Sequence, residues 1–273
     1  PDSWRPLHAL LAVVLGLAAL GASVLHLGRP LYAFRAVLGL RTSWMSREIL
    51  AFGLFAPLAL LYAGSFWHEA AAGAVGLPRL APEVATRAQQ GLALAVTLAG
   101  AAGVTCSILI YHVTRRPFWS GARVAFRFTL TAVLLGLATA QATATVGSAL
   151  GGAPPPGLSS ATLATLTAVV AAVKLTGEAL FLRHLGDRAL TPLRRTAYLH
   201  THDLARLTSA RFAGGALGGL ALPAFLAAAA PGASAPRLAL ALASLALLVA
   251  GELLERTLFF AAVTAPGMPG GLK

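Results

Sequence analysis

Seven long apolar segments alternate with polar or glycine- and proline-rich connections along this 273-residue chain. Each segment is close to the roughly 20 residues that a helix needs to cross the hydrocarbon core of a bilayer. Uninterrupted apolar runs favour helices over the strands of a membrane barrel, which alternate between apolar and polar side chains. The pattern therefore predicts an all-α polytopic membrane protein, an up-and-down helix bundle with one integral membrane domain over residues 1–273. The predicted spans cover residues 7–27, 48–65, 89–111, 124–148, 161–182, 212–230 and 238–263.

The composition agrees with a membrane protein. Hydrophobic residues make up 57% of the sequence and charged residues only 11%, whereas a soluble domain carries about 25% charged residues. The formal net charge of +12 does not indicate nucleic-acid binding, because the arginines lie in short connections between apolar segments. Cys106 is the only cysteine. A single cysteine can neither build a disulfide framework nor ligate an iron–sulfur cluster. No compact set of histidine, cysteine and acidic residues predicts a metal site.

The arginines divide the connections into two classes. Those after the first, third and fifth spans are strongly basic, whereas the others are nearly neutral. Because basic loops stay in the cytoplasm, we expect these loops on the cytoplasmic side. The sequence starts at Pro1 rather than at a methionine, so we expect residues upstream and one further helix, giving eight spans in the complete protein. The basic loops carry Arg29, Arg35, Arg41 and Arg47, then Arg115, Arg116 and Arg123, then Arg183, Arg188, Arg194, Arg195, Arg206 and Arg211.

Two ionisable residues lie where the first span ends and the second begins. His26 closes the first span and Glu48 opens the second, so both belong to the same side of the membrane. Histidine and glutamate can accept and pass on a proton near neutral pH, which makes both residues candidates for catalysis. The alternative is that His26 is a helix-end residue solvated by lipid headgroups, and Glu48 a first-turn acid favoured by the helix dipole.

Charged residues also lie inside the fifth and seventh spans, where two pairs of opposite charge are each four residues apart on one helix face. A further acid, Glu255, has no such neighbour and must find a partner elsewhere. These residues either form self-neutralised pairs that face the bundle interior or belong to a proton path. In the sixth span, two overlapping GxxxG patterns within residues 214–219 predict close helix packing. The pairs are Lys174 with Glu178 and Glu252 with Arg256.

A transmembrane b-type haem requires two histidines at one depth on facing helices. No histidine lies in the middle of a predicted span, and His200 and His202 lie in a loop. We therefore expect no haem in this protein. A haem close to the basic surface, held by His26, His112 or His184, stays an alternative.

Motifs near both ends of the sequence resemble the membrane-anchor subunits of dimethyl-sulfoxide-reductase-type molybdoenzyme complexes, the DmsC family. By its pattern of spans the resemblance extends over almost the whole sequence, but its specific motifs occupy only about the first 50 and the last 30 residues. Near the start these motifs are His26–Leu27–Gly28–x–Pro30, Leu31–Tyr32–Ala33–Phe34 and Ser46–Arg47–Glu48–Ile49. Near the end they are Gly251–Glu252–Leu253–Leu254–Glu255–Arg256, Leu258–Phe259–Phe260 and Gly267–Met268.

The resemblance implies a haem-free anchor of eight helices in the cytoplasmic (inner) membrane of a prokaryote. Such an anchor oxidises menaquinol and passes the electrons to a four-cluster, ferredoxin-like iron–sulfur subunit, which delivers them to a catalytic subunit with molybdopterin. In the quinol site implied here, His26 and Glu48 are the catalytic residues, and Tyr32, Ser46 and Arg47 line the site. The family's first helix has no counterpart in this sequence.

Three other interpretations stay open. Polysulfide-reductase or NrfD-type quinone anchors share the same architecture. A proton-coupled small-solute transporter would use the charges of the fifth and seventh spans, although the sequence shows neither the repeat nor the paired broken helices that transporters contain. A scaffold without redox function would only tether soluble subunits to the membrane.

Overall fold

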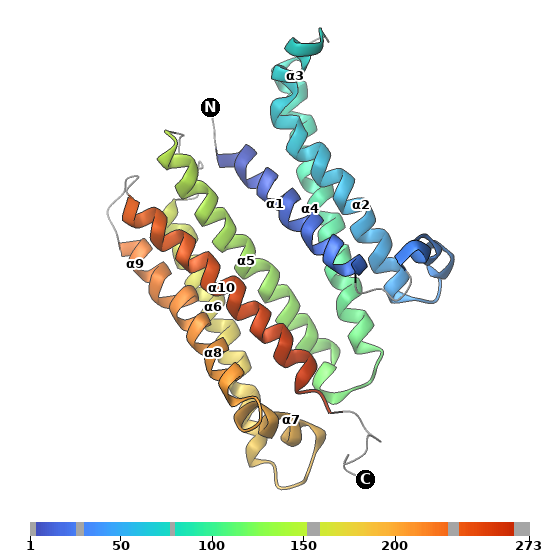
Figure 1. The fold of residues 1–273 in the computed structure, drawn as a ribbon, viewed down its shortest axis with the longest axis vertical. Coiled ribbons are helices and arrows are strands. Elements are labelled where there is room, and N and C mark those ends of the chain that lie inside the picture. Colours follow the sequence, from blue (N-terminus) through green and yellow to red (C-terminus); the bar gives the residue numbers. More distant parts are fainter. Residues whose placement is uncertain (1–3, 26–29, 77–79, 152–158, 229–234, 265–273) are drawn as a thin grey trace. The chain divides into compact units, whose positions relative to one another are not determined.

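The computed structural model describes residues 4–25, 30–76, 80–151, 159–228 and 235–264, which are almost entirely helical (Figure 1). Seven helical segments among these residues are long and apolar enough to cross a membrane, so the predicted number of spans and the all-α fold class are confirmed. The segments are Trp4–Ser23, Trp44–Trp67, Pro82–His112, Gly121–Ala149, Ser160–Gly186, Ala205–Ala228 and Ala235–Ala261.

The helices form two compact units, which we call the N-terminal unit (Arg5–Ile110) and the C-terminal unit (Tyr111–Lys273 with Pro1–Trp4). The N-terminal unit is built from α1 (Trp4–Leu25), η1 (Pro30–Gly39), α2 (Trp44–Gly64), η2 (Ser65–Trp67), α3 (His68–Val75) and α4 (Pro82–His112). The C-terminal unit is built from η3 (Pro117–Trp119), α5 (Gly121–Ala149), α6 (Ser160–Phe181), η4 (Leu182–Gly186), α7 (Pro192–Thr201), α8 (Ala205–Ala216), η5 (Leu217–Ala221), α9 (Leu222–Ala228) and α10 (Ala235–Ala261).

The helices of the N-terminal unit meet at a small apolar cluster and are less buried than the spans of the C-terminal unit. Ala9 and Val13 of α1 pack against Ala59 and Ala63 of α2, and Val96 of α4 is among the partly buried residues at the edge of this cluster. The aromatic side chains of Phe55, Tyr62 and Phe66 also pack against this cluster. In a bilayer, where lipid tails are as apolar as the side chains, such dispersion contacts contribute to holding helices together.

The described residues of the C-terminal unit form a bundle of four helical rods. One rod is continuous through α8, the π-helical turn η5 and α9, and the other three are α5, α6 and α10. Helix α10 packs against α5 and α8, while α6 packs against α5 and α9, so each rod touches two others. Figure 1 shows α5, α10 and α8 running side by side along this unit.

The glycines of the sixth span allow its close approach to α10 and α6, as the GxxxG patterns predicted. A Cβ atom on Gly218 would lie 2.7 Å from Leu247 Cβ and 3.0 Å from the Ser244 carbonyl oxygen. A Cβ atom on Gly219 would lie 2.6 Å from Ala171 Cβ. The Ser244 hydroxyl donates to the Gly218 carbonyl oxygen over 2.6 Å, a bond that this close contact makes possible.

The segment after the fifth span differs from the predicted polar loop. Residues Pro192–Thr201 form α7, whose first turn is capped by the Thr191 hydroxyl accepting from the Arg194 N–H over 3.1 Å. Helix α8 then begins at Ala205, seven residues before the predicted start at 212, so Arg211 is helical. Its side chain is only 1% exposed. The prediction that Arg211 is a loop arginine is therefore wrong, and the reason is that its charge is paired inside the bundle.

Candidate functional site

Glu48 lies on α2, on a side of the helix that meets α4. The Ser43 hydroxyl accepts from the Ser46 N–H over 3.3 Å and caps α2, so the helix starts at Trp44 and Glu48 falls in its second turn. Ser107 of α4 donates its hydroxyl proton to Glu48 Oε1. The Glu48 side chain is half-buried. A carboxylate is thus held between two apolar spans while part of it stays accessible.

Arg47 fastens the start of α2 to the segment before it. Its Nε donates to the Leu40 carbonyl oxygen over 2.8 Å, and its terminal nitrogen donates to the Arg41 carbonyl oxygen over 3.0 Å. The guanidinium carbon also lies 4.0 Å from the centroid of the Trp44 ring. Within the described residues, Arg47 and Glu48 form no ion pair, so Arg47 orients the turn rather than the carboxylate.

The other two predicted lining residues occupy different environments. Ser46 is buried, and a Cβ atom on Gly39 would lie 2.6 Å from its hydroxyl oxygen, so the end of η1 packs directly on Ser46. Tyr32 lies on η1 with 53% of its surface exposed. The guanidinium carbon of Arg35 is 5.2 Å from the Tyr32 ring centroid. Ser46 is therefore part of the packing, whereas Tyr32 is on the surface of the unit.

His26 lies within residues 26–29, outside the described residues, and directly follows Leu25, the last residue of α1. Among the described site residues, Ser46, Arg47 and Glu48 share the first turns of α2, with Ser107 of α4 beside Glu48. Ser107 was not predicted as a site residue from the sequence. Consecutive spans run in opposite directions, so the end of the third span lies at the same depth in the membrane as the start of the second. Ser107, a polar residue near the end of the third span, could have been identified from this relation.

A second cluster of polar side chains occupies the interior of the C-terminal unit, with Lys174 of α6 at its centre. Lys174 is fully buried. Its Nζ lies 3.1 Å from Glu252 Oε2 on α10 and 3.5 Å from Glu178 Oε1, which confirms the predicted pairing of Lys174 with Glu178. It also donates to the Thr131 hydroxyl over 2.8 Å and to the Arg127 carbonyl oxygen over 3.1 Å. Three helices are thus joined through one ammonium group.

Arg211 of α8 is the second cation of this cluster. Its Nε and one terminal nitrogen donate to the two carboxylate oxygens of Glu178, over 3.1 and 2.9 Å. The same terminal nitrogen lies 2.9 Å from Glu252 Oε1. Two parallel hydrogen bonds to one carboxylate are the strongest geometry available to an arginine. Glu178 is therefore held mainly by Arg211, with Lys174 as its second partner.

Another ion pair joins α5 to α10, since a terminal nitrogen of Arg127 lies 3.1 Å from Glu255 Oε1. The expectation that Glu255 finds its partner on another helix is confirmed. The predicted pair of Glu252 with Arg256 does not form. Glu252 instead faces the two cations inside the bundle, while the Arg256 guanidinium carbon lies 3.9 Å from the centroid of the Phe128 ring.

The charges of this cluster, which we call the charge network, balance one another. Three basic and three acidic side chains are buried together, and Thr131 donates to Glu252 Oε2 within the same group. Thr131, Arg127 and the internal position of Arg211 were not predicted from the sequence. The seventh span contains two acids, Glu252 and Glu255, but only one base, so one acid needed a cation from another span. Arg127, inside the predicted span 124–148, could have been identified as that cation. The network consists of Arg127, Lys174, Arg211, Glu178, Glu252 and Glu255.

An apolar layer adjoins the charge network on the side of the neutral loops. Leu134 and Ala138 of α5, Ala171 of α6 and Leu248 of α10 form one buried cluster. Each lies about one to three helical turns from the network residue on its own helix. Buried ions are therefore followed along the bundle axis by a layer of side chains without polar groups.

His200 borders the charge network on the side away from the apolar layer. It was predicted to lie in a loop, but it belongs to α7 and is buried. Its Nδ1 lies 3.4 Å from the Thr208 hydroxyl oxygen, and a cavity of about 20 Å³ separates it from Arg211 and Glu255. Burial, and then the positive charge of Arg127, lower the pKa of His200 from 6.5 to about 4. His200 is thus neutral at pH 7.

We expect the stability of the C-terminal unit to depend on pH through His200. The folded state binds a proton less readily than the unfolded state, whose histidine has a pKa of 6.5. The free energy of unfolding is therefore highest above pH 6.5. It decreases as the pH falls toward 4, by an amount on the order of 2–3 kcal/mol. Thermal unfolding of the purified protein between pH 7.5 and pH 4 should show this loss.

The comparison of His200→Gln with His202→Gln isolates this effect, because His202 is exposed in the same segment. The His200 variant should lose less stability on acidification than the wild-type protein, and the His202 variant should behave like the wild type. Equal pH profiles for all three proteins would show that His200 is not the titrating group.

Comparisons with known proteins identify the family of this chain. A subunit of the sulfite dehydrogenase of Allochromatium vinosum is 34% identical over 116 residues, which are 42% of this chain and 34% of that protein. A subunit of the anaerobic dimethyl sulfoxide reductase of Haemophilus influenzae is 30% identical over 138 residues, 50% of this chain and 45% of that protein. The matches span less than half of each relative, and no solved structure matches significantly. A family model described as the DMSO reductase anchor subunit (DmsC) matches residues 7–262, and this chain therefore belongs to that family.

Proposed function

We propose that this chain is the quinol-binding anchor of a respiratory molybdoenzyme complex, and that the quinol site lies at the start of α2. The observation that carries the proposal is the carboxylate of Glu48, which Ser107 holds between α2 and α4 while part of it stays accessible. An ionisable group at the end of apolar spans is costly, which makes it a candidate for function. His26, which follows α1 in the sequence, supplies the second proton-accepting group.

The chemistry at this site is the oxidation of menaquinol to menaquinone, which releases two protons and two electrons. His26 accepts a proton from one quinol hydroxyl, and Glu48 accepts or relays the second. Ser107 orients the Glu48 carboxylate, and Arg47 holds the η1–α2 turn that borders the site. In the reverse direction the same groups return protons to a quinone.

The electrons leave to another protein, because the single cysteine of this sequence cannot ligate an iron–sulfur cluster. We propose a four-cluster, ferredoxin-like iron–sulfur subunit as the acceptor and a molybdopterin subunit as the catalytic partner. The names of the two relatives support this, since one belongs to a dimethyl sulfoxide reductase and the other to a sulfite dehydrogenase. By the positive-inside rule, the arginine-rich loops lie on the cytoplasmic face of a prokaryotic inner membrane.

Substitution of Glu48 by glutamine tests this function in the assembled complex. We expect quinol oxidation to fall about tenfold or more, because glutamine keeps the shape and the bond to Ser107 but cannot take up a proton. Stopped-flow measurement of quinol-dependent electron transfer gives the rate, and co-purification of the iron–sulfur subunit shows that the complex is assembled.

The matched control is Glu83→Gln, which removes the same charge from an exposed position in the first turn of α4. The control should oxidise quinol at the wild-type rate. If Glu48→Gln retains that rate as well, the quinol site does not use this carboxylate and the proposal fails.

The charge network supports the anchor over the alternative of a proton-coupled transporter. A transporter needs a polar route that reaches both membrane surfaces. The apolar layer of Leu134, Ala138, Ala171 and Leu248 lies between the network and the neutral end of the C-terminal unit. We propose that the network stabilises this unit by joining its four rods, and that it does not carry solutes across the membrane.

A further inference from the structure

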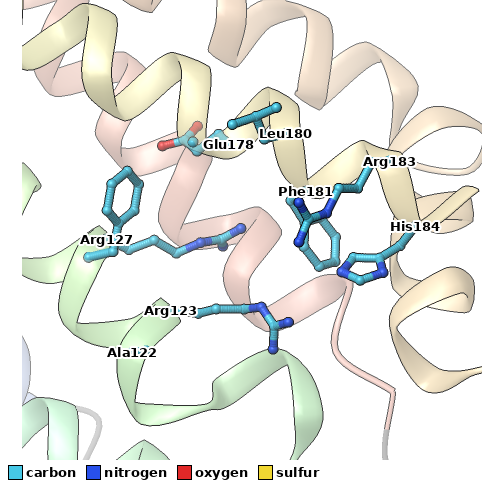
Figure 2. A pocket seen from close by; sticks show the side chains of 10 residues that line it. Ala122, Arg123, Arg127, Glu178, Leu180, Phe181, Arg183 and His184 are labelled. Atoms are coloured by element: carbon cyan, nitrogen blue, oxygen red, sulfur yellow. The ribbon is translucent and has the colours of Figure 1, made fainter.

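A groove lies between α5 and the end of α6, within the C-terminal unit (Figure 2). Its volume is about 320 Å³, which is within the range of small-molecule sites. Arg123 of α5 and Arg183 and His184 of η4 extend toward the space between these helices in Figure 2. Phe126, Leu180 and Phe181 supply apolar lining. The groove thus combines a cationic end with an apolar wall.

The positive charge of this groove is not cancelled by the acids around it. Glu178 lines the groove, but Arg211 and Lys174 already neutralise it. Arg123 donates only to neutral acceptors in the described structure, the Pro117 carbonyl oxygen over 2.7 Å and the Ser120 hydroxyl over 3.1 Å. Arg183 is exposed and forms no ion pair with any described residue. Two guanidinium groups therefore face the groove without a carboxylate partner.

The apolar wall depends on a glycine. The Phe126 ring packs on Gly177 of α6, where an added Cβ atom would lie 2.3 Å from the ring. This contact lets the ring lie close against α6 and leaves the space beside Leu180 open. Leu180 is 58% exposed, so the wall continues onto the exposed surface of the helix.

We propose that this groove binds the phosphate of an anionic phospholipid, with Arg123 and Arg183 contacting the phosphate and an acyl chain lying along Phe126 and Leu180. Paired guanidinium groups suit phosphate oxygens, because each can donate two parallel hydrogen bonds. Basic pockets between transmembrane helices at a membrane surface suit anionic headgroups. A phosphate ester without a hydrocarbon tail would satisfy the arginines but would leave the apolar wall uncovered.

Native mass spectrometry of the full-length protein, released from micelles that contain phosphatidylglycerol or phosphatidylcholine, tests the proposal. The wild-type protein should retain phosphatidylglycerol about 25-fold more strongly than phosphatidylcholine, since each of the two arginines near an anionic headgroup contributes roughly a factor of five. The variant R123Q/R183Q should lose this preference. R183Q alone should lose part of it, and because Arg183 is exposed this variant should keep the wild-type helix content by circular dichroism.

The control variant is R188Q/R206Q, which removes the same charge from exposed positions at the same end of the bundle but outside the groove. It should keep the preference for phosphatidylglycerol. An equal loss in both double variants, or no loss in either, would overturn the proposal. Release of the bound lipid by inorganic phosphate alone would assign the groove to a soluble phosphate ester and would equally overturn it.

Discussion

Replacement of His26 by alanine is expected to lower quinol oxidation about 100-fold or more while the complex stays assembled. The expectation follows from the chemistry, because a quinol gives up its electrons only when its hydroxyl protons can leave. Histidine is the side chain whose ordinary pKa suits that acceptance near pH 7. The rate should be measured with a menaquinol analogue in the complete complex, together with the content of the iron–sulfur subunit.

Two further variants make the His26 result specific. His202→Ala removes an exposed histidine that stacks on Tyr198 in the C-terminal unit, and this variant should keep the wild-type rate. His26→Gln retains a hydrogen-bonding group without a titrating nitrogen, and it should stay close to the alanine variant in rate. Normal turnover in His26→Ala would remove His26 from the mechanism, and recovery in His26→Gln would reduce its role to hydrogen bonding.

Lys174→Leu is expected to destabilise the C-terminal unit by roughly 3–5 kcal/mol, the cost of leaving a buried charge without its partner. Lys174 is fully buried and contacts both Glu178 and Glu252. Its removal leaves three buried acids with two buried bases. The midpoint of thermal unfolding in detergent and the amount of folded protein in membranes should both fall. Thr176→Leu, at an exposed position on the same helix, should leave both unchanged.

A second substitution should restore much of the lost stability when it restores the charge balance. The double variant Lys174→Leu with Glu252→Leu keeps the bidentate pair of Arg211 with Glu178 and the pair of Arg127 with Glu255. We expect it to be more stable than Lys174→Leu alone, with a coupling of about 1–3 kcal/mol. If the two losses simply add, the side chains are independent and the charge network is not a cooperative unit.

The number of spans and the presence of buried charges were predictable from the sequence, because both follow from local patterns. Long apolar runs fix the number of helices, and the four-residue spacing of Lys174 and Glu178 correctly indicated a shared face. The same spacing failed for Glu252 and Arg256. Sharing a face does not exclude a better partner, and the bundle interior offers Glu252 both Lys174 and Arg211.

Contacts between helices far apart in the sequence could not be predicted from the hydrophobic pattern alone. The bonds from Arg211 to Glu178 and from Arg127 to Glu255 depend on which rods are neighbours. The same limit applies to the candidate site, where Glu48 was identified from its position but its contact with Ser107 joins residues 59 positions apart. The bounds of α7 were not predicted, although Thr191 followed by Pro192 is a typical helix start, because the polar sequence between the fifth and sixth spans lacks a long apolar run.

The distribution of the charge network among the rods constrains how this protein is made. Helices α5, α6 and α8 carry all three of its basic side chains but only one acid, while both remaining acids, Glu252 and Glu255, belong to α10. During synthesis these three helices therefore enter the bilayer with an excess of positive charge, which is costly there. Only α10, which is made after them, can neutralise it. We therefore expect the C-terminal unit to close last at α10, whose acids neutralise the excess positive charge of the other three rods.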